Sequence, residues 1–80
     1  MVFTIEIEQE QDGRWIAEVI ELSGVMAYGP TPDKAKAKVQ AFALRVLAER
    51  VEHGEAGKDL LNISFNAAWA NGPAPEPEGS

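Results

Sequence analysis

The chain is 80 residues long, with thirteen acidic and seven basic residues, a formal net charge of -6 at pH 7 and no cysteine. This length fits one small domain, the lack of cysteine excludes a disulfide framework or a thiolate metal site, and the acidic balance argues against direct binding of nucleic acid, which needs a basic surface. The first residues alternate and carry charge, so they predict neither a signal peptide nor a membrane span, and we expect a cytoplasmic protein.

Three strands are predicted before residue 30. Residues 2–9 alternate between apolar and polar side chains, as a half-buried strand requires. Asp12 and Gly13 supply the side-chain capping and the positive φ of a tight turn, and residues 14–20 predict the second strand. A short third strand is expected over residues 25–29, after a break at a serine and a glycine.

Charge gives a prediction for the register of the first two strands. Pairing Ile7 with Trp15 keeps their apolar faces together. A shift by two residues would also do so, but it would place Glu6 directly opposite Glu18. Because like charges in opposite positions destabilise a sheet, we expect the register that avoids this pair.

A helix is predicted from Pro32 to about His53. Thr31 is the expected N-cap, a proline at the first helical position and an aspartate in the first turn favour the start, and Gly54 suits the left-handed position after the end. One apolar stripe should pack on the sheet: Ala35, Val39, Phe42, Ala43, Val46 and Leu47.

A second apolar group lies on roughly the opposite side of the predicted helix. Its members are Ala37, Ala41, Leu44, Ala48 and Val51. A helix that covers one sheet and faces water does not need such a group. Because exposed apolar patches usually mark interfaces, we expect this group to form an oligomer interface, in a homodimer or a larger assembly.

The last predicted strand covers residues 60–66, with Leu61, Ile63 and Phe65 pointing inward. Trp69 follows it and is expected either to cover the end of the sheet or to dock into a neighbouring chain. The order β-β-β-α-β predicts an α+β domain over residues 1–69, a mainly antiparallel sheet with one helix packed on one face, in which the first three strands are antiparallel. We expect the most buried residues to include Phe3, Ile5, Trp15, Ala17, Val39, Phe42, Val46 and Ile63. Residues 70–80 are rich in proline and glycine and predict a flexible tail.

Several short pieces occur in the order and spacing of one known family: Asp12-Gly13, Trp15-Ile16-Ala17, Glu21-Leu22-Ser23-Gly24, Gly29 and Thr31. Over about residues 2–53 the chain therefore resembles the HicB-like antitoxin family. It departs from the family pattern where Ile20 and Ser23 replace two prolines, Pro30 stands in a Gly-x-Thr slot and Lys34 replaces an acidic residue.

The resemblance implies a partial ribonuclease H-like fold without its catalytic residues, and a small basic HicA-like toxin that degrades messenger RNA as the partner. Family members often carry a DNA-binding segment after this domain. Only fifteen residues follow Phe65, so we expect a solitary antitoxin-type domain without such a segment.

Glu6, Glu8 and Glu18 share the predicted outer face of the sheet and are the candidate partner-binding residues. Three carboxylates are also possible ligands for a divalent cation, but a solvated polar face is the favoured interpretation. His53 is the only histidine and has no cysteine or second histidine to complete a reactive set, so we expect no enzyme, no catalytic residue, no cofactor and no metal.

Two functions remain open at this stage. The first is an antitoxin-like module that neutralises a basic toxin by covering its active site, with acidic side chains steering association. The second is a stand-alone scaffold or regulatory oligomerisation domain derived from such antitoxins, with no toxin partner.

Overall fold

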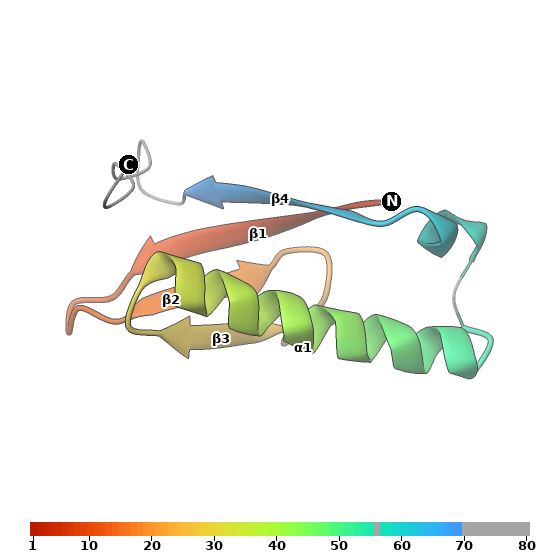
Figure 1. The fold of residues 1–80 in the computed structure, drawn as a ribbon, viewed down its shortest axis with the longest axis horizontal. Helices are drawn as coiled ribbons and strands as arrows, with labels where there is room; N and C mark the ends of the chain where they lie inside the picture. Colours follow the sequence, from red (N-terminus) through yellow and green to blue (C-terminus); the bar gives the residue numbers. More distant parts are fainter. Residues whose placement is uncertain (56, 70–80) are drawn as a thin grey trace.

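One helix covers one face of a four-stranded sheet (Figure 1). The computed structural model describes residues 1–55 and 57–69. The elements in chain order are β1 (Val2–Gln9), β2 (Trp15–Val19), β3 (Met26–Gly29), α1 (Pro32–Glu52), the 3₁₀ helix η1 (Lys58–Leu61) and β4 (Ser64–Trp69). The predicted α+β class and the order β-β-β-α-β are confirmed. The tail predicted for residues 70–80 lies outside the described residues.

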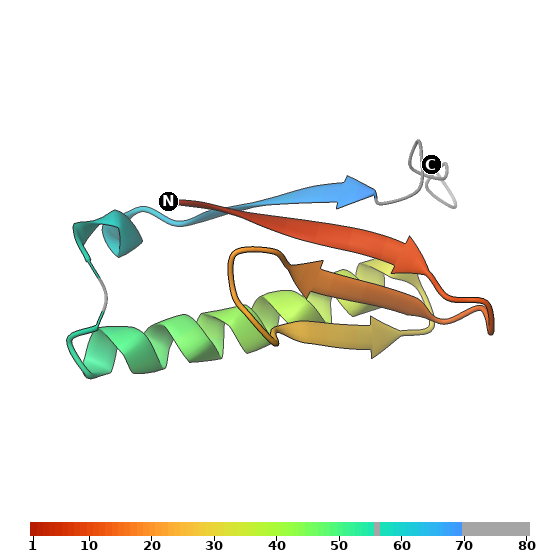
Figure 2. The same ribbon diagram turned by 180° about the vertical axis from the view of Figure 1, so that it is seen from behind.

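The sheet is mixed: the three strands that were predicted to be antiparallel are so, and the fourth, β4, is parallel to its neighbour. Its strand order is β3-β2-β1-β4, with antiparallel pairing of β2 to both β1 and β3 and parallel pairing of β4 to β1. The chain reaches β4 through α1, which returns it to the start of β1, so that Ser64 lies opposite Val2. Such a helical crossover is the usual connection to a parallel strand. Figure 2 shows β4 beside β1 at the edge of the sheet.

The predicted register of β1 and β2 is wrong by two residues, because Glu6 lies directly opposite Glu18. The turn fixes this register. The Glu10 N–H donates to the Arg14 carbonyl at 2.7 Å, and the Gly13 N–H donates to the Glu10 carbonyl at 3.0 Å. Gly13 has a φ of 91°, which glycine adopts without a steric cost. The two glutamates lie on the outer face, Glu6 exposed and Glu18 half-buried, where water and salt weaken their repulsion, so the turn geometry decides the register.

The ends of α1 match the prediction. Thr31 is the N-cap, and its side-chain oxygen accepts a hydrogen bond from the Lys34 N–H at 3.2 Å. The helix ends at Glu52, and His53 is the C-cap, with its N–H donating to the Glu49 carbonyl. Gly54 follows with a φ of 70°, the left-handed conformation that commonly ends a helix.

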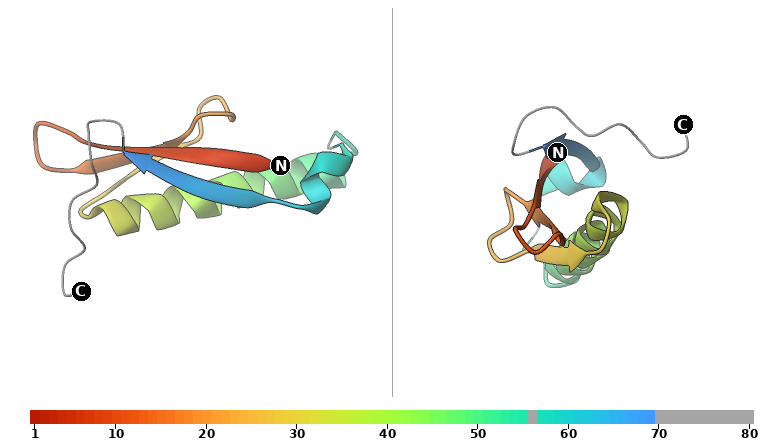
Figure 3. Two further views of the ribbon diagram at one scale, coloured as in Figure 1. Left: turned by 90° about the horizontal axis from the view of Figure 1, so that it is seen from above. Right: turned by 90° about the vertical axis from the view of Figure 1, so that its left-hand side faces the viewer.

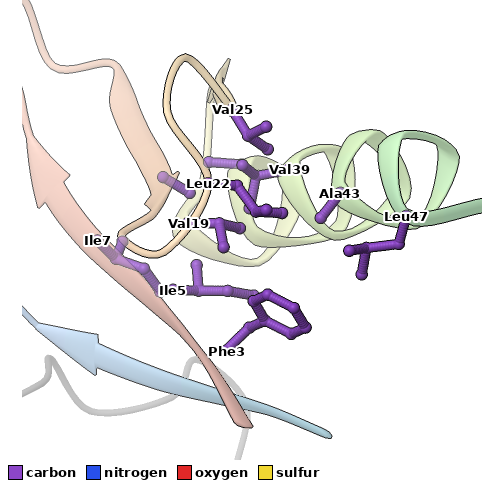
Figure 4. Close-up of a cluster of buried hydrophobic side chains, with 11 residues drawn as sticks. Phe3, Ile5, Ile7, Val19, Leu22, Val25, Val39, Ala43 and Leu47 are labelled. Carbon is purple, nitrogen blue, oxygen red and sulfur yellow. The ribbon is translucent and has the colours of Figure 1, made fainter. Parts of the chain in front are cut away.

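The core lies between α1 and the inner face of the sheet (Figure 4). Its members are at most 3% exposed: Phe3, Ile5, Ile7, Ala17, Val19, Leu22, Val25, Ala35, Val39, Ala43 and Leu47. Four of the eight expected core residues are thus confirmed. Trp15, Phe42 and Val46 are only partly buried, and Ile63 is 37% exposed, so its predicted burial is wrong.

The predicted position of the last strand is also corrected. η1 occupies residues 58–61, where the strand was expected to begin, and Leu61 is 83% exposed instead of pointing inward. The strand starts at Ser64 and extends to Trp69, so that Phe65 and Trp69 lie on the inner face and are partly buried. Because η1 turns the chain before the strand begins, the apolar residues that precede Ser64 do not follow the alternation of β4.

Candidate protein-binding surface

The predicted acidic residues meet on the outer face of the sheet, the face opposite α1. Glu6 of β1 lies opposite Glu18 of β2, and Glu18 lies opposite Met26 of β3. Glu8 lies two residues along β1 from Glu6 and therefore points to the same face. The structure thus brings together the three predicted partner-binding residues, and the side-by-side placement of two carboxylates is closer than the predicted register had implied.

Apolar side chains lie among these carboxylates. Ile16 is the cross-strand partner of Glu8 on one side and of Tyr28 on the other. Ile16 is half-buried, whereas Met26 and Tyr28 are 42% and 40% exposed. Sequence reasoning missed Met26 and Tyr28, although the alternation in the short third strand places both on the outer face. The surface is therefore a mixture of acidic and apolar side chains on rigid strands.

The turn between β1 and β2 closes one end of this face. The Arg14 guanidinium lies over the Tyr28 ring, 4.5 Å from its centroid, and its Nε donates to the Asp12 carboxylate at 2.7 Å. The Tyr28 hydroxyl donates to the Glu10 carboxylate at 3.5 Å. The Arg14 backbone N–H, and then its side chain, donate to Asp12 and lower the pKa of that carboxyl below its ordinary value. Arg14 is thus held at the turn and does not lie opposite a glutamate of β1.

The charges of Glu6 and Glu18 are not paired with a cation among the described residues. In the described part of the chain, ion pairs join Asp12 with Arg14 and Asp33 with Lys36, at 2.7 and 3.6 Å, and neither includes Glu6 or Glu18. Glu6 is exposed and Glu18 is half-buried, and like charges in opposite positions of a sheet repel each other modestly. The arrangement therefore lowers the stability of the single chain slightly.

The second apolar group of the helix is exposed along its whole length, as the helical spacing predicts. All five members lie at the surface: Ala37, Ala41, Leu44, Ala48 and Val51. Leu44 and Val51 are the large ones, at 45% and 56% exposure. This second surface is on the helix and is separate from the acidic outer face of the sheet.

A shallow pocket of about 230 Å³ lies where α1, the start of β1 and η1 meet. Phe3, Leu47 and Leu60 line its apolar part, and Glu21 and Arg50 lie at its rim. Ligand pockets usually measure about 300 to 1,000 Å³ and enclose most of the ligand. The pocket is too small and too open to define a substrate site.

Residues 1–55 and 57–69 contain no group of three or more His, Cys, Asp or Glu side chains placed to hold a metal ion. His53 Nδ1 lies 2.7 Å from the Glu49 carbonyl, at the end of α1. Among the same residues, no helix combines the length and apolar character that crossing a membrane requires.

No family model matches this sequence, and neither a curated protein nor a solved structure matches the chain. The two surfaces, the acidic outer face of the sheet and the apolar outer side of α1, are therefore the features from which a function can be inferred.

Proposed function

We propose that this chain is an antitoxin-like protein-binding module that neutralises a small basic, mRNA-degrading toxin by covering its active site. The observation that carries the proposal is the outer face of the sheet, where Glu6 and Glu18 lie side by side without cationic partners among the described residues. Acidic side chains on rigid strands attract a basic protein and orient it before contact.

The composition of this face also supports binding to a protein. Met26 and Tyr28 are exposed beside the carboxylates, and methionine and tyrosine are enriched at protein interfaces. A partner that covers them removes apolar area from water, which supplies affinity, while the carboxylates supply specificity and association rate. The net charge of -6 favours a basic partner in general. The resemblance of residues 2–53 to the HicB-like antitoxins agrees with such a partner.

The test is a growth-rescue experiment with the product of a short reading frame adjacent to this gene that encodes a basic protein. Induced expression of that protein should stop growth, and co-expression of this chain should restore it. The triple variant Glu6→Lys, Glu8→Lys, Glu18→Lys should fail to restore growth, because it reverses the charge of the proposed contact surface.

A matched control changes the net charge equally at another place. Glu49→Lys, Glu52→Lys, Glu55→Lys alters three exposed carboxylates at the end of α1 and should still restore growth. Purified proteins should also bind less rapidly as salt rises, since salt screens exposed charges. Equal rescue by both triple variants would exclude the outer face as the binding surface.

A second candidate function is a stand-alone scaffold or regulatory oligomerisation domain. The exposed second apolar group of α1 supports it, because Leu44 and Val51 are large, apolar and uncovered in a single chain. A gene neighbourhood without a short basic reading frame would favour this second function over the first.

A further inference from the structure

The inner face of β4 is not covered by the helix. α1 packs against β1, β2 and β3, and β4 lies beyond β1 at the edge of the sheet (Figure 3). One pair of neighbouring residues marks the edge of the area that α1 covers. Ile5 of β1 is 1% exposed, whereas Ala67, its partner on β4, is exposed on the same face of the sheet.

Ala67 is a small, exposed residue that lies between two larger aromatic side chains on the inner face of β4. Phe65 and Trp69 lie two residues before and after it, so all three point to the inner face. Phe65 stacks on Phe3, with ring centroids 5.6 Å apart, and Trp69 contacts Trp15 edge to face at 5.9 Å. The two rings are therefore held in place by β1 and β2, while Ala67 between them is exposed.

The exposed side of α1 has the complementary shape. Leu44 projects from it, and its neighbours one turn away on either side are Ala41 and Ala48. The alanines leave room on both sides of the leucine. The exposed stripe from Ala37 to Val51 is about 21 Å long at 1.5 Å per residue, and the six residues of β4 span about 20 Å.

We propose that two copies of this chain form a symmetric dimer in which Leu44 of each inserts between Phe65 and Trp69 of the other, over Ala67. Each helix is then apolar on two opposite sides because it is enclosed by two sheets, its own and that of the second copy. The contact between helix and strand is formed twice, as two-fold symmetry requires. This inference is independent of the proposed toxin binding, which uses the opposite face of the sheet.

Charge and area favour a second copy as the occupant. Neither the second apolar group of α1 nor β4 contains a charged residue, although a quarter of the chain is charged, so the net charge of -6 does not oppose this contact locally. Each protomer contributes a helix strip about 20 Å long and about 10 Å wide and a strand strip of the same length and about 5 Å wide, a flat area of about 300 Å². Protruding side chains make the accessible area larger than this flat area, and a specific interface needs roughly 500 Å² per partner.

Among the described strands, β4 is at the edge of the sheet, and another strand would add there through backbone hydrogen bonds. Pairing of two β4 strands through their edges is the alternative dimer, and it does not use Leu44.

Light scattering and sedimentation at micromolar concentration test the proposal on the full chain. The wild type should have twice the chain mass of 8.7 kDa. Leu44→Lys and Ala67→Glu should each give a folded monomer, because both residues are exposed in the single chain and their replacement leaves its core intact. Asn66→Glu is the matched control on the outer face of the same strand, and it should remain a dimer. Circular dichroism confirms folding of each variant.

Mixing the two monomeric variants gives the sharpest result. A pair of one Leu44→Lys chain and one Ala67→Glu chain retains one wild-type contact and places opposite charges at the other, so the mixture should recover the dimer mass. Loss of the dimer in Leu44→Lys but not in Ala67→Glu would overturn the proposal in favour of helix-to-helix contact. A dimer that persists in both variants would favour edge pairing of β4 and overturn it, as would a wild-type mass of 8.7 kDa.

Discussion

Trp15 of β2 and Trp69 of β4 meet edge to face, with ring centroids 5.9 Å apart and an angle of 84° between the rings. β1 lies between these two strands, so the contact joins the edge strand to the antiparallel part of the sheet across a third strand. Aromatic pairs in this geometry contribute about 0.5 to 1.5 kcal/mol beyond the area that they bury. The pair therefore fixes the end of β4.

We expect Trp15→Ala to lower the free energy of unfolding by about 2 to 3 kcal/mol, less than the about 3 to 5 kcal/mol typical of a fully buried aromatic residue, because Trp15 is only partly buried. A double-mutant cycle with Trp69→Ala should give a coupling energy of about 1 kcal/mol. Urea unfolding of the four proteins measures both quantities. Strictly additive effects would show that the ring contact does not form in solution.

Gly29 gives a second prediction, because β3 and α1 approach each other closely there. A Cβ at this position would lie 2.6 Å from the backbone N of Ala35, a distance that real side chains do not show. We expect Gly29→Ala to lower the free energy of unfolding by about 1 to 3 kcal/mol, since either the strand or the helix must move.

Gly57 is the matched control for this substitution. It has an ordinary φ of -81°, and nothing lies within 4 Å of a Cβ at this position. Gly57→Ala should leave the stability unchanged or raise it by about 0.4 to 1 kcal/mol, because alanine restricts the unfolded chain more than glycine does. Gly29→Ala should therefore lower the free energy of unfolding, whereas Gly57→Ala should leave it unchanged or raise it. Equal changes for the two variants in thermal and urea unfolding would contradict the close approach at Gly29.

The strands were predictable from the sequence where the two faces of the sheet differ. Alternation located β1 and β2 and placed Phe3 and Ile5 correctly in the core. The register was not predictable from charge, because the hydrogen bonds of the turn are stronger constraints than the repulsion between two carboxylates on the outer face. The parallel direction of β4 follows from the long crossover through α1. The composition of the strand itself does not indicate its direction.

For the candidate surface, the face on which each residue lies was predictable from the sequence, but the contacts between residues of different strands were not. A period of two assigns Glu6 and Glu18 to one face, whatever the register. Their direct opposition depends on the turn. The exposure of Ala67 depends on where α1 stops covering the sheet, and this is a property of packing between elements that no local pattern encodes.

Glu21 gives a pH-dependent prediction. Its carboxylate accepts a hydrogen bond from the Thr4 N–H at 2.8 Å, just beyond the end of β2. Burial is the largest single influence and raises the pKa of the Glu21 carboxyl, but the hydrogen bonds from the Thr4 backbone, from the backbone of Glu21 itself and from the Thr4 side chain together outweigh it, so the pKa lies below its ordinary value of 4.5. The folded state therefore binds a proton less readily than the unfolded state does, and the stabilisation is complete above pH 4.5 and lost as pH falls through the lowered pKa.

The comparison protein is Glu21→Gln, which keeps an acceptor oxygen but does not titrate. The wild type should be more stable than this variant at pH 7, by at most about 1 kcal/mol because the group is exposed. Urea unfolding at pH 3 should show a smaller difference. A difference that stays constant between pH 7 and pH 3 would mean that the charge of Glu21 does not strengthen the bond.

The last prediction concerns the opposition of Glu6 and Glu18 across β1 and β2. Glu6→Lys replaces a like-charge pair by an opposite-charge pair and should raise the free energy of unfolding by about 0.2 to 1 kcal/mol. The gain should shrink at 1 M salt, where the Debye length is about 3 Å. The double variant Glu6→Lys, Glu18→Lys again has two like charges in opposite positions, so it should lose this gain in the free energy of unfolding.

The same substitution should act in the opposite direction on function, because the carboxylates of the outer face are proposed to attract the basic partner. Glu6→Lys should therefore be more stable than the wild type and yet slower to associate with that partner. Association rates measured by surface plasmon resonance, beside unfolding curves of the same samples, make the comparison. Higher stability with an unchanged association rate would place the partner elsewhere on the molecule, and unchanged stability would mean that the two side chains diverge into solvent.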